Sequence, residues 1–286
     1  MSLRQGWLQD GGRAGSDRHY GCDLVAIDVD GTLLNTRWEI TDDIESAINN
    51  AIARGIHVTL ASGRNRMGLL RVINRLGLSQ PYISSGGALV ADYPDGQIIS
   101  HNPVPREESR VIVELARTKS VGIFFESQDC IYAEAGLDVI ERIKPLNDTN
   151  VVVVDDILQA GPNDPTKVTI VGERDALLSI EREIHRRNQP VHLTYSTPIY
   201  MEVTQSGVNK GTALTRLAEH LHISLERVVA IGDAKNDISM FDVAGLAVAM
   251  GNAPAEVKKA ADLVAPTNDE SGVAWVLRRL VPYSDQ

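Results

Sequence analysis

The sequence predicts an α/β fold: a doubly wound, Rossmann-like core on a parallel sheet, with an inserted α+β cap domain. Residues 22–87 and 202–286 alternate short apolar runs with amphipathic segments of helical period, the pattern of βαβ units. Residues 88–201 mix hairpin and helix signals, which indicates a domain of different architecture. Residues 1–21 are rich in Gly, Arg, Asp and Ser without periodicity, so we expect a disordered leader there.

Composition excludes several classes of protein. The 286 residues carry a formal net charge of −10, which argues against a nucleic-acid partner. The two cysteines, Cys22 and Cys130, belong to no CxxC pair, so we expect neither a disulfide framework nor structural zinc. No run of about 18 apolar residues and no hydrophobic N-terminal stretch is present, so we expect no membrane span, no secretory signal and a cytoplasmic location.

The first core segment shows strand and helix signals in alternation. Leu24–Ile27 is a short apolar run, typical of a strand buried on both faces. Thr41 is a candidate cap for a helix that Gly55 ends, and Ile56–Leu60 is the next expected strand. A second amphipathic helix ends at Gly77. This βαβα order predicts a parallel sheet with helices on its faces.

The middle of the chain begins with a hairpin signal. The stretch ALVADYPDGQIIS has a Pro-Asp-Gly turn between two apolar runs. We expect helices near residues 107–118 and 174–187, and short strands near 121–126, 167–171, 192–195 and 200–203.

The last third returns to α/β alternation. A helix is expected from Lys210, and Val228–Ile231 is an expected strand that ends on Gly-Asp. Further short strands are expected at 246–249 and 263–264. The whole pattern is that of one α/β core interrupted by an inserted domain.

The stretch LVAIDVDGTLLN ends a predicted strand on two carboxylates. Asp28 and Asp30 lie at the carboxyl end of the strand, where sites form in open parallel sheets, and Gly31 permits a tight turn. Two adjacent carboxylates are stable together if they share a divalent cation or if one is protonated. The alternative is an Asp-rich turn that only caps a helix.

The stretch VTLASGRN also runs from a strand into a helix. The Ser62 hydroxyl and the free backbone N–H groups around Gly63 would suit a phosphate oxygen. The alternative is that Ser62 is simply the N-cap of the helix.

The stretch GVNKGTAL places Lys210 at the start of a helix. A cation there opposes the helix dipole, and holding a phosphate group is one reason for it. The alternative is a solvated surface lysine.

The stretch VVAIGDAKNDISMF ends another strand on polar residues. Asp233 follows the strand directly, and Asn236 and Asp237 come within one further turn. This cluster suits a hard cation. The alternative, a capped helix start, accounts for only one of the aspartates.

In order and spacing, the segments DVDGT, ASGR, NKG and GDAKND resemble the signature motifs of the haloacid-dehalogenase superfamily of phosphohydrolases. The long insertion between the second and third motifs is similar to that of the Cof-type branch, whose large cap lies there. The resemblance covers about residues 22–282. It implies a Mg²⁺-dependent phosphatase that hydrolyses a small phosphorylated metabolite through an aspartyl-phosphate intermediate. A sugar phosphate is the favoured substrate.

The resemblance also implies a role for each motif residue. Asp28 would be the nucleophile, and Asp30 the general acid and base. Magnesium would bind the Asp28 carboxylate, the Asp30 main-chain carbonyl and Asp233. Asp237 would support the metal from just outside. The residues implied to hold the phosphoryl group are Ser62, Gly63, Lys210 and Asn236.

Two positions depart from the family's pattern. Gly86-Gly87 stands where relatives usually have Asn-Gly, so an asparagine contact is missing and the hinge has more backbone freedom. Ser62 replaces the commoner threonine and keeps the hydroxyl.

Two other functions are compatible with these motifs. A phosphomutase or phosphotransferase would pass the aspartyl-phosphate to another hydroxyl, and an inactive binding module would keep only the fold. We expect a monomer or a homodimer that binds no nucleic acid and no membrane.

Overall fold

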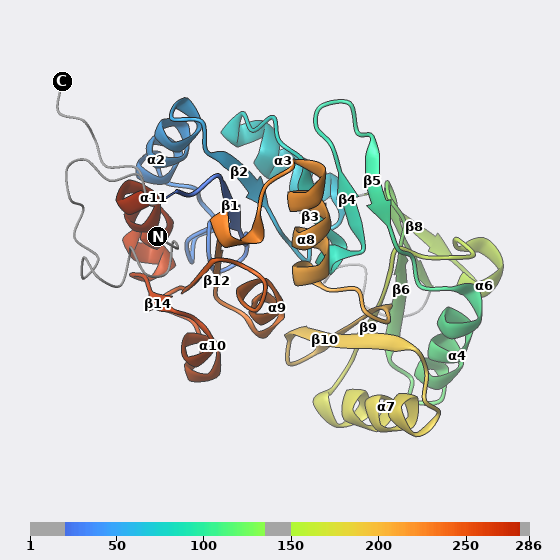
Figure 1. Ribbon diagram of the computed structural model, residues 1–286. Coiled ribbons are helices and arrows are strands. Elements are labelled where there is room, and N and C mark those ends of the chain that lie inside the picture. Colours follow the sequence, from blue (N-terminus) through green and yellow to red (C-terminus); the bar gives the residue numbers. More distant parts are fainter. Residues whose placement is uncertain (1–20, 135–149, 281–286) are drawn as a thin grey trace.

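The computed structural model describes residues 21–134 and 150–280 (Figure 1). Apart from Gly21, the expected leader lies outside the described residues. In Figure 1 a parallel sheet with its helices lies on the left, and a second sheet with α4 and α7 lies on the right. Within the described ranges, no helix is long and apolar enough to cross a bilayer.

The core is a five-stranded parallel sheet in the order β14-β13-β12-β1-β2. Its strands are β1 (Leu24–Ile27), β2 (His57–Leu60), β12 (Val228–Gly232), β13 (Leu246–Ala249) and β14 (Leu263–Val264). Both faces of β1 are buried, because Val25 and Ile27 pack into one hydrophobic cluster and Leu24 and Ala26 into another. The predicted doubly wound α/β core is therefore confirmed.

In the part of the chain that the structure describes, six helices cover the two faces of this sheet. Their bounds are α2 (Asp42–Ala53), α3 (Arg66–Leu76), α8 (Lys210–His220), α9 (Ile238–Phe241), α10 (Ala255–Ala260) and α11 (Gly272–Leu280). The first cluster holds apolar residues of α2, α3 and α11, and the second those of α8, α9 and α10.

The predicted helix signals near the first motif are confirmed. The Thr41 hydroxyl accepts a hydrogen bond from the Ile44 N–H and caps α2. Gly77 ends α3 in the left-handed conformation, with φ of 62°. These signals set the residues at which each helix starts or stops. The loops that carry the motifs follow the carboxyl ends of the parallel strands and therefore lie at one edge of the sheet.

A small antiparallel sheet borders the core. It consists of β3 (Tyr82–Ser84), β4 (Leu89–Ala91) and β5 (Ile98–His101). The last two strands are the hairpin that the Pro-Asp-Gly turn predicts. A bridge from Ala61 to Ile83 joins β3 to the loop after β2.

The cap carries a six-stranded sheet in the order β10-β11-β9-β6-β7-β8. Its elements are β6 (Gly122–Glu126), β7 (Cys130–Glu134), β8 (Asn150–Val154), β9 (Lys167–Val171), β10 (Val191–Thr197), β11 (Tyr200–Gln205), α4 (Arg106–Arg117), α6 (Ile157–Ala160) and α7 (Arg174–Arg186). Ile123 and Phe125 of β6 pack with α4 and α7 in one hydrophobic cluster. Phe124 and Glu126, at alternate positions, point to the opposite face. Strands β7 and β8 have no counterpart among our predictions.

The division into residues 22–87 and 202–286 for the core and 88–201 for the cap stays a proposal. Strand pairing favours slightly later boundaries. The hairpin β4-β5 pairs with β3, and β11 pairs with β9 and β10 of the six-stranded sheet.

Candidate active site

The motif residues meet at the carboxyl edge of the parallel sheet. In the register of the three central strands, Ile27 lies beside Ile231 on one side and Leu60 on the other. Asp28, which directly follows β1, therefore emerges next to the strand ends that lead to Asp233 and Ser62. Segments more than 170 residues apart in sequence thus converge on one place.

Lys210 lies at the centre of this edge, from the first turn of α8. Its Nζ is 2.5 Å from Oδ1 of Asp28 and 2.6 Å from Oδ1 of Asp237. The residue is 1% exposed, so the alternative of a solvated surface lysine is wrong. Burial alone would lower the pKa of Lys210, but Asp237 and Asp28 outweigh that effect and raise it, so the lysine is charged.

Asp237 organises the loop after β12. Its Oδ2 accepts hydrogen bonds from the N–H groups of Asp233 (3.0 Å) and Ala234 (2.9 Å). The Thr32 hydroxyl donates to Oδ1 of Asp233 at 2.8 Å and so links the first motif to this loop. The two acidic residues of the fourth motif are therefore held in fixed positions relative to Asp28.

Three carboxylates of this site fit a divalent cation. Ligand oxygens of Asp28, Asp233 and Asp237 can all lie within 4.8 Å of one another. Burial, followed by the charge of Asp237, raises the pKa of Asp28 well above its usual range. Burial also raises the pKa of Asp233 to about 6. One lysine does not stabilise three ionised carboxylates, and a hard cation with oxygen ligands would do so.

The Asp30 side chain lies outside that cluster and is paired with Arg64. The guanidinium donates from Nε to Oδ2 at 2.9 Å and from Nη2 to Oδ1 at 2.6 Å. Arg64 also lies 5.9 Å from the centroid of the Trp38 ring. The pairing of Arg64 with Asp30 has no local sequence signal. The predicted metal contact of Asp30 uses its main-chain carbonyl and stays a prediction.

The second motif has the expected polar loop, but Ser62 is not a helix cap. Asn65 caps α3, since its side chain accepts from the Gly68 N–H at 2.8 Å. Ser62 is buried, and its Oγ accepts from the N–H of Arg64 at 3.1 Å. The alternative of a capping serine is therefore wrong, and the hydroxyl proton of Ser62 can still be donated to a ligand.

Asn236 has a side-chain atom that the protein itself leaves unsatisfied. Its Oδ1 is buried and has no hydrogen-bond partner among the described residues. A buried amide without a partner costs free energy unless a ligand or water satisfies it, and its oxygen and nitrogen can exchange places by a flip. This observation is consistent with the expected role in phosphate binding.

Two glycines permit close approaches around the site. Gly31 has φ of 89°, and a Cβ there would lie 2.4 Å from Oδ2 of Asp233. Gly87 has φ of 104°, and its Cβ would lie 2.3 Å from the carbonyl oxygen of Asn209. At Gly86, by contrast, a Cβ would meet nothing within 4 Å. Gly86 has φ of 69°, so an asparagine there would have room for its side chain but would adopt a left-handed backbone conformation, which asparagine tolerates better than most residues.

The cap covers the site and encloses a cavity of about 200 Å³ next to Asp28. The core side chains that line it include Asp28, Asp30, Trp38, Arg64 and Asn236, and the cap side chains are Phe124, Glu126, Lys167, Thr169, Thr197, Tyr200 and Glu202. A larger cavity of about 840 Å³ adjoins it and reaches Lys210 and the strand β10. A substrate phosphate near Asp28 would thus have its leaving group against the cap.

None of these cap residues was predicted from the sequence. Their signal is a charged side chain inside an apolar strand, in GIFFE, KVTIV and YMEVT. Strand alternation places Glu126, Lys167 and Glu202 on the face opposite the hydrophobic core of the cap. Charged side chains are rarely buried in strands unless they are paired, so such positions are candidates for a buried ion pair or a site.

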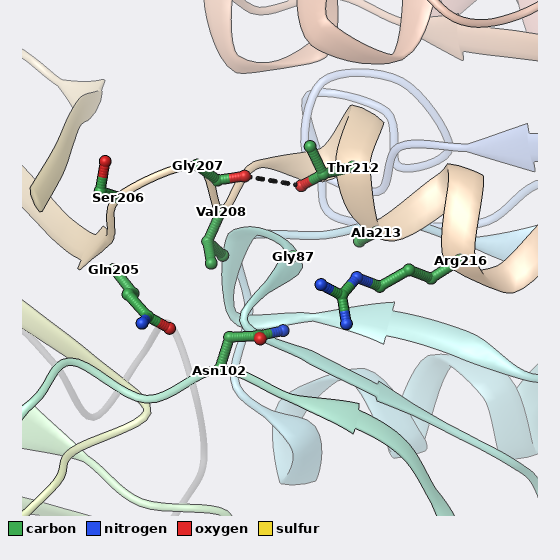
Figure 2. A pocket seen from close by; sticks show the side chains of 9 residues that line it. All are labelled: Gly87, Asn102, Gln205, Ser206, Gly207, Val208, Thr212, Ala213 and Arg216. Carbon is green, nitrogen blue, oxygen red and sulfur yellow. Dashed lines mark hydrogen bonds between the residues drawn. The ribbon is translucent and has the colours of Figure 1, made fainter.

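A separate cavity of about 220 Å³ lies where the two chain segments connect core and cap (Figure 2). Asn102 lines it from the first connection, Gln205–Val208 from the second and Arg216 from α8. The Thr212 hydroxyl donates to the Gly207 carbonyl at 3.0 Å across one side of it. None of the predicted site residues lines this cavity.

Comparisons with known proteins agree with the motifs. The sequence model of haloacid dehalogenase-like hydrolases matches residues 25–277. The 5-amino-6-(5-phospho-D-ribitylamino)uracil phosphatase YcsE of Bacillus subtilis is 31% identical, over 90% of this chain and 95% of that protein. A haloacid dehalogenase-like hydrolase from Bacteroides thetaiotaomicron is similar in structure, with a TM-score of 0.84, 33% identity and coverage of 91% and 99% of the two chains. The HAD subclass IIB sugar phosphatase BT4131 has the same fold at 24% identity, with a TM-score of 0.79 and coverage of 90% and 98%.

Proposed function

The chain belongs to the family of haloacid dehalogenase-like hydrolases and is a phosphatase, and from that premise we propose how it acts and on what. It is a Mg²⁺-dependent phosphatase of small phosphorylated metabolites, in particular of sugar phosphates. The reaction passes through an aspartyl-phosphate on Asp28.

One observation carries this proposal: a buried aspartate touches a charged lysine and shares its surroundings with two further carboxylates. In the first step a carboxylate oxygen of Asp28 forms a bond to phosphorus, and the bond from phosphorus to the ester oxygen breaks. Asp30 gives its proton to the departing alkoxide. Arg64 orients the Asp30 carboxyl group through hydrogen bonds from its Nε and Nη2.

In the second step Asp30 takes a proton from a water molecule. The hydroxide that forms attacks phosphorus, the bond to Asp28 breaks, and inorganic phosphate leaves. Lys210, Asn236, the Ser62 hydroxyl and the N–H of Gly63 hold the phosphoryl oxygens, since the N–H groups of Ser62 and Arg64 donate to Ile83 and to Ser62. Asp28 and Asp233, with the Asp30 carbonyl and support from Asp237, would hold Mg²⁺, which would neutralise charge on the phosphate.

The activities in the names of two similar proteins support a polyol substrate. YcsE is a phosphatase of a phosphoribityl compound, and BT4131 is a sugar phosphatase. The leaving group in both carries hydroxyl groups. We extend this chemistry to the present chain, and we retain the proposals of a cytoplasmic location and of a monomer or homodimer.

The test is hydrolysis of p-nitrophenyl phosphate by the wild type, with Mg²⁺ and with excess EDTA, and by Asp28→Asn. We expect phosphate release with Mg²⁺, its loss with EDTA, and a drop in kcat of roughly 10⁴-fold or more for Asp28→Asn. The control is Asp262→Asn, at an aspartate that accepts a hydrogen bond from the Ala247 N–H away from the site. Activity that survives Asp28→Asn would contradict the mechanism, and transfer to a second alcohol without phosphate release would favour the phosphotransferase alternative.

A further inference from the structure

A second buried ionic cluster lies in the cap, above the site. Glu126 of β6, Lys167 of β9 and Glu202 of β11 are 3%, 3% and 9% exposed. Lys167 and Glu202 are 2.9 Å apart, and Lys167 and Glu126 are 3.4 Å apart. All three side chains line the 200 Å³ cavity next to Asp28. The mechanism above uses none of them.

Lys167 has no hydrogen-bond donor left for a ligand. An ammonium group has three donors. One is given to the main-chain carbonyl of Gly63 at 2.6 Å, one to Oε1 of Glu202, and one points to Oε2 of Glu126. Glu126 is occupied as well, since its Oε1 accepts from the hydroxyl of Ser85. The cluster thus joins the cap to the core, and all three donors of the Lys167 ammonium group are occupied.

The other cationic side chain that lines this cavity, Arg64, already forms an ion pair within the protein. Arg64 is held by Asp30 through both Nε and Nη2. By contrast, Oε2 of Glu202 accepts no hydrogen bond from any residue in the described part of the chain, while Oε1 binds Lys167. A carboxylate oxygen can accept from a ligand, and it repels a second anion.

Building on the proposed function, we propose that Glu202 is a specificity residue that accepts a hydrogen bond from a hydroxyl of the leaving group. The cavity therefore selects phosphate esters of neutral polyols and rejects esters that carry a second anionic group. The exposed ring of Trp38 and the side chains of Phe124 and Tyr200 give the polyol carbon atoms apolar surface in the same cavity.

The phosphoryl end and the leaving-group end of the site thus have opposite preferences. Lys210 and the proposed cation favour the dianionic phosphate, and Glu202 disfavours negative charge a short distance away. A hydroxyl that meets a buried charged acceptor is strongly preferred over a group that cannot donate.

The experiment compares two substrates of the same length, sorbitol 6-phosphate and 6-phosphogluconate, which differ in whether carbon 1 is an alcohol or a carboxylate. For the wild type we expect kcat/KM to be larger for sorbitol 6-phosphate by at least about tenfold. Glu202→Gln keeps the shape but removes the charge and adds an amide donor. It should lower this ratio about 10- to 100-fold.

The matched control is Glu183→Gln, the same change on the outer helix α7, where the glutamate pairs with Arg186 and Arg187. It should leave the substrate ratio as in the wild type. The melting temperature of each variant in the presence of Mg²⁺ shows whether it is folded.

Three outcomes separate the proposals. If the protein shows no Asp28-dependent hydrolysis of p-nitrophenyl phosphate, the proposed function itself is wrong. If that hydrolysis is present, a wild type that prefers 6-phosphogluconate overturns the specificity proposal, whether or not Glu202→Gln folds. An unchanged ratio in a folded Glu202→Gln protein does so too.

Discussion

The molecule has two buried ionic clusters, and each combines one lysine with carboxylates, in different numbers. In the core, Lys210 lies between Asp28 and Asp237, and Asp233 is close by. In the cap, Lys167 lies between two glutamates and also donates to a main-chain carbonyl. Each cluster has one lysine that is almost completely buried.

The difference lies in what each cluster lacks. Burial and neighbouring carboxylates raise the pKa of Asp28 and of Asp233 in the core, so that cluster is short of positive charge. In the cap, burial likewise raises the pKa of Glu126, and the charge of the two glutamates raises the pKa of Lys167 despite its burial. There, however, one lysine serves two carboxylates, and each glutamate has a hydrogen-bond partner. The core cluster thus has three carboxylates for one lysine and the cap cluster has two, which is why we place the proposed metal ion in the core.

The largest effect should follow from Lys210→Met, which removes the cation of the core cluster. We expect kcat/KM for p-nitrophenyl phosphate to fall about 10²–10³-fold, since a donor to the transition state is lost. The buried carboxylates that remain should also lower the free energy of unfolding by about 3–5 kcal/mol. Steady-state kinetics and urea denaturation measure the two effects.

If the core cluster is a metal site, saturating Mg²⁺ should restore part of the stability that Lys210→Met loses. Lys259→Met, on the exposed side of α10, is the control and should change neither quantity. A Lys210→Met protein with wild-type activity would contradict the assignment.

Lys167→Met makes the same change in the cap and should behave differently. Two buried glutamates lose their shared cation, so the free energy of unfolding should fall by about 3–5 kcal/mol. Mg²⁺ should stabilise Lys167→Met as much as it stabilises the wild type, because the core site is intact. The difference in unfolding free energy between Lys167→Met and the wild type should therefore stay the same with Mg²⁺, whereas for Lys210→Met it should shrink. Urea denaturation with and without Mg²⁺ makes the comparison, and equal recovery in the two lysine variants would refute the distinction.

Metal binding by itself should stabilise the wild type. With free Mg²⁺ at 100 times its dissociation constant, the free energy of unfolding should rise by about 2.7 kcal/mol. Asp233→Asn should abolish most of this gain, whereas Asp262→Asn should keep it. Thermal melting over a Mg²⁺ titration is the measurement, and an undiminished gain in Asp233→Asn would exclude Asp233 as a ligand.

The smallest effect should come from Thr32→Val, which removes the hydroxyl that donates to Asp233. A single hydrogen bond to a charged group contributes about 1.5–3 kcal/mol, and Asp233 keeps its other surroundings. We expect Mg²⁺ affinity to fall about tenfold with little change in the fold, as judged by circular dichroism. If the Mg²⁺ affinity does not change, the contact with Thr32 does not position Asp233 for metal binding.

Local signals in the sequence were sufficient for most of the core. The strand predicted at Leu24–Ile27, the cap at Thr41 and the end of a helix at Gly77 are all confirmed. Each depends on side chains within a few residues, and hydrophobic period and capping chemistry act over that distance. The strands β7 and β8 were missed, because short runs such as CIYAE carry no clear period or turn signal.

Sequence order also predicted that the motif residues would meet, because the carboxyl ends of parallel strands share one edge of the sheet. It did not predict which partners they would choose. The contact of Lys210 with Asp28 spans 182 residues, and the pairing of Arg64 with Asp30 joins two different motifs.

The sequence by itself thus determined the strands of the parallel sheet, the helices α2, α3 and α8, and the edge at which the motif residues gather, but not the helices α9, α10 and α11. Only the tertiary structure decided that Glu126, Lys167 and Glu202 share one buried cluster over that edge. They lie on three strands whose pairing depends on packing across the whole cap, and no spacing within a single segment encodes which charged side chains then become neighbours.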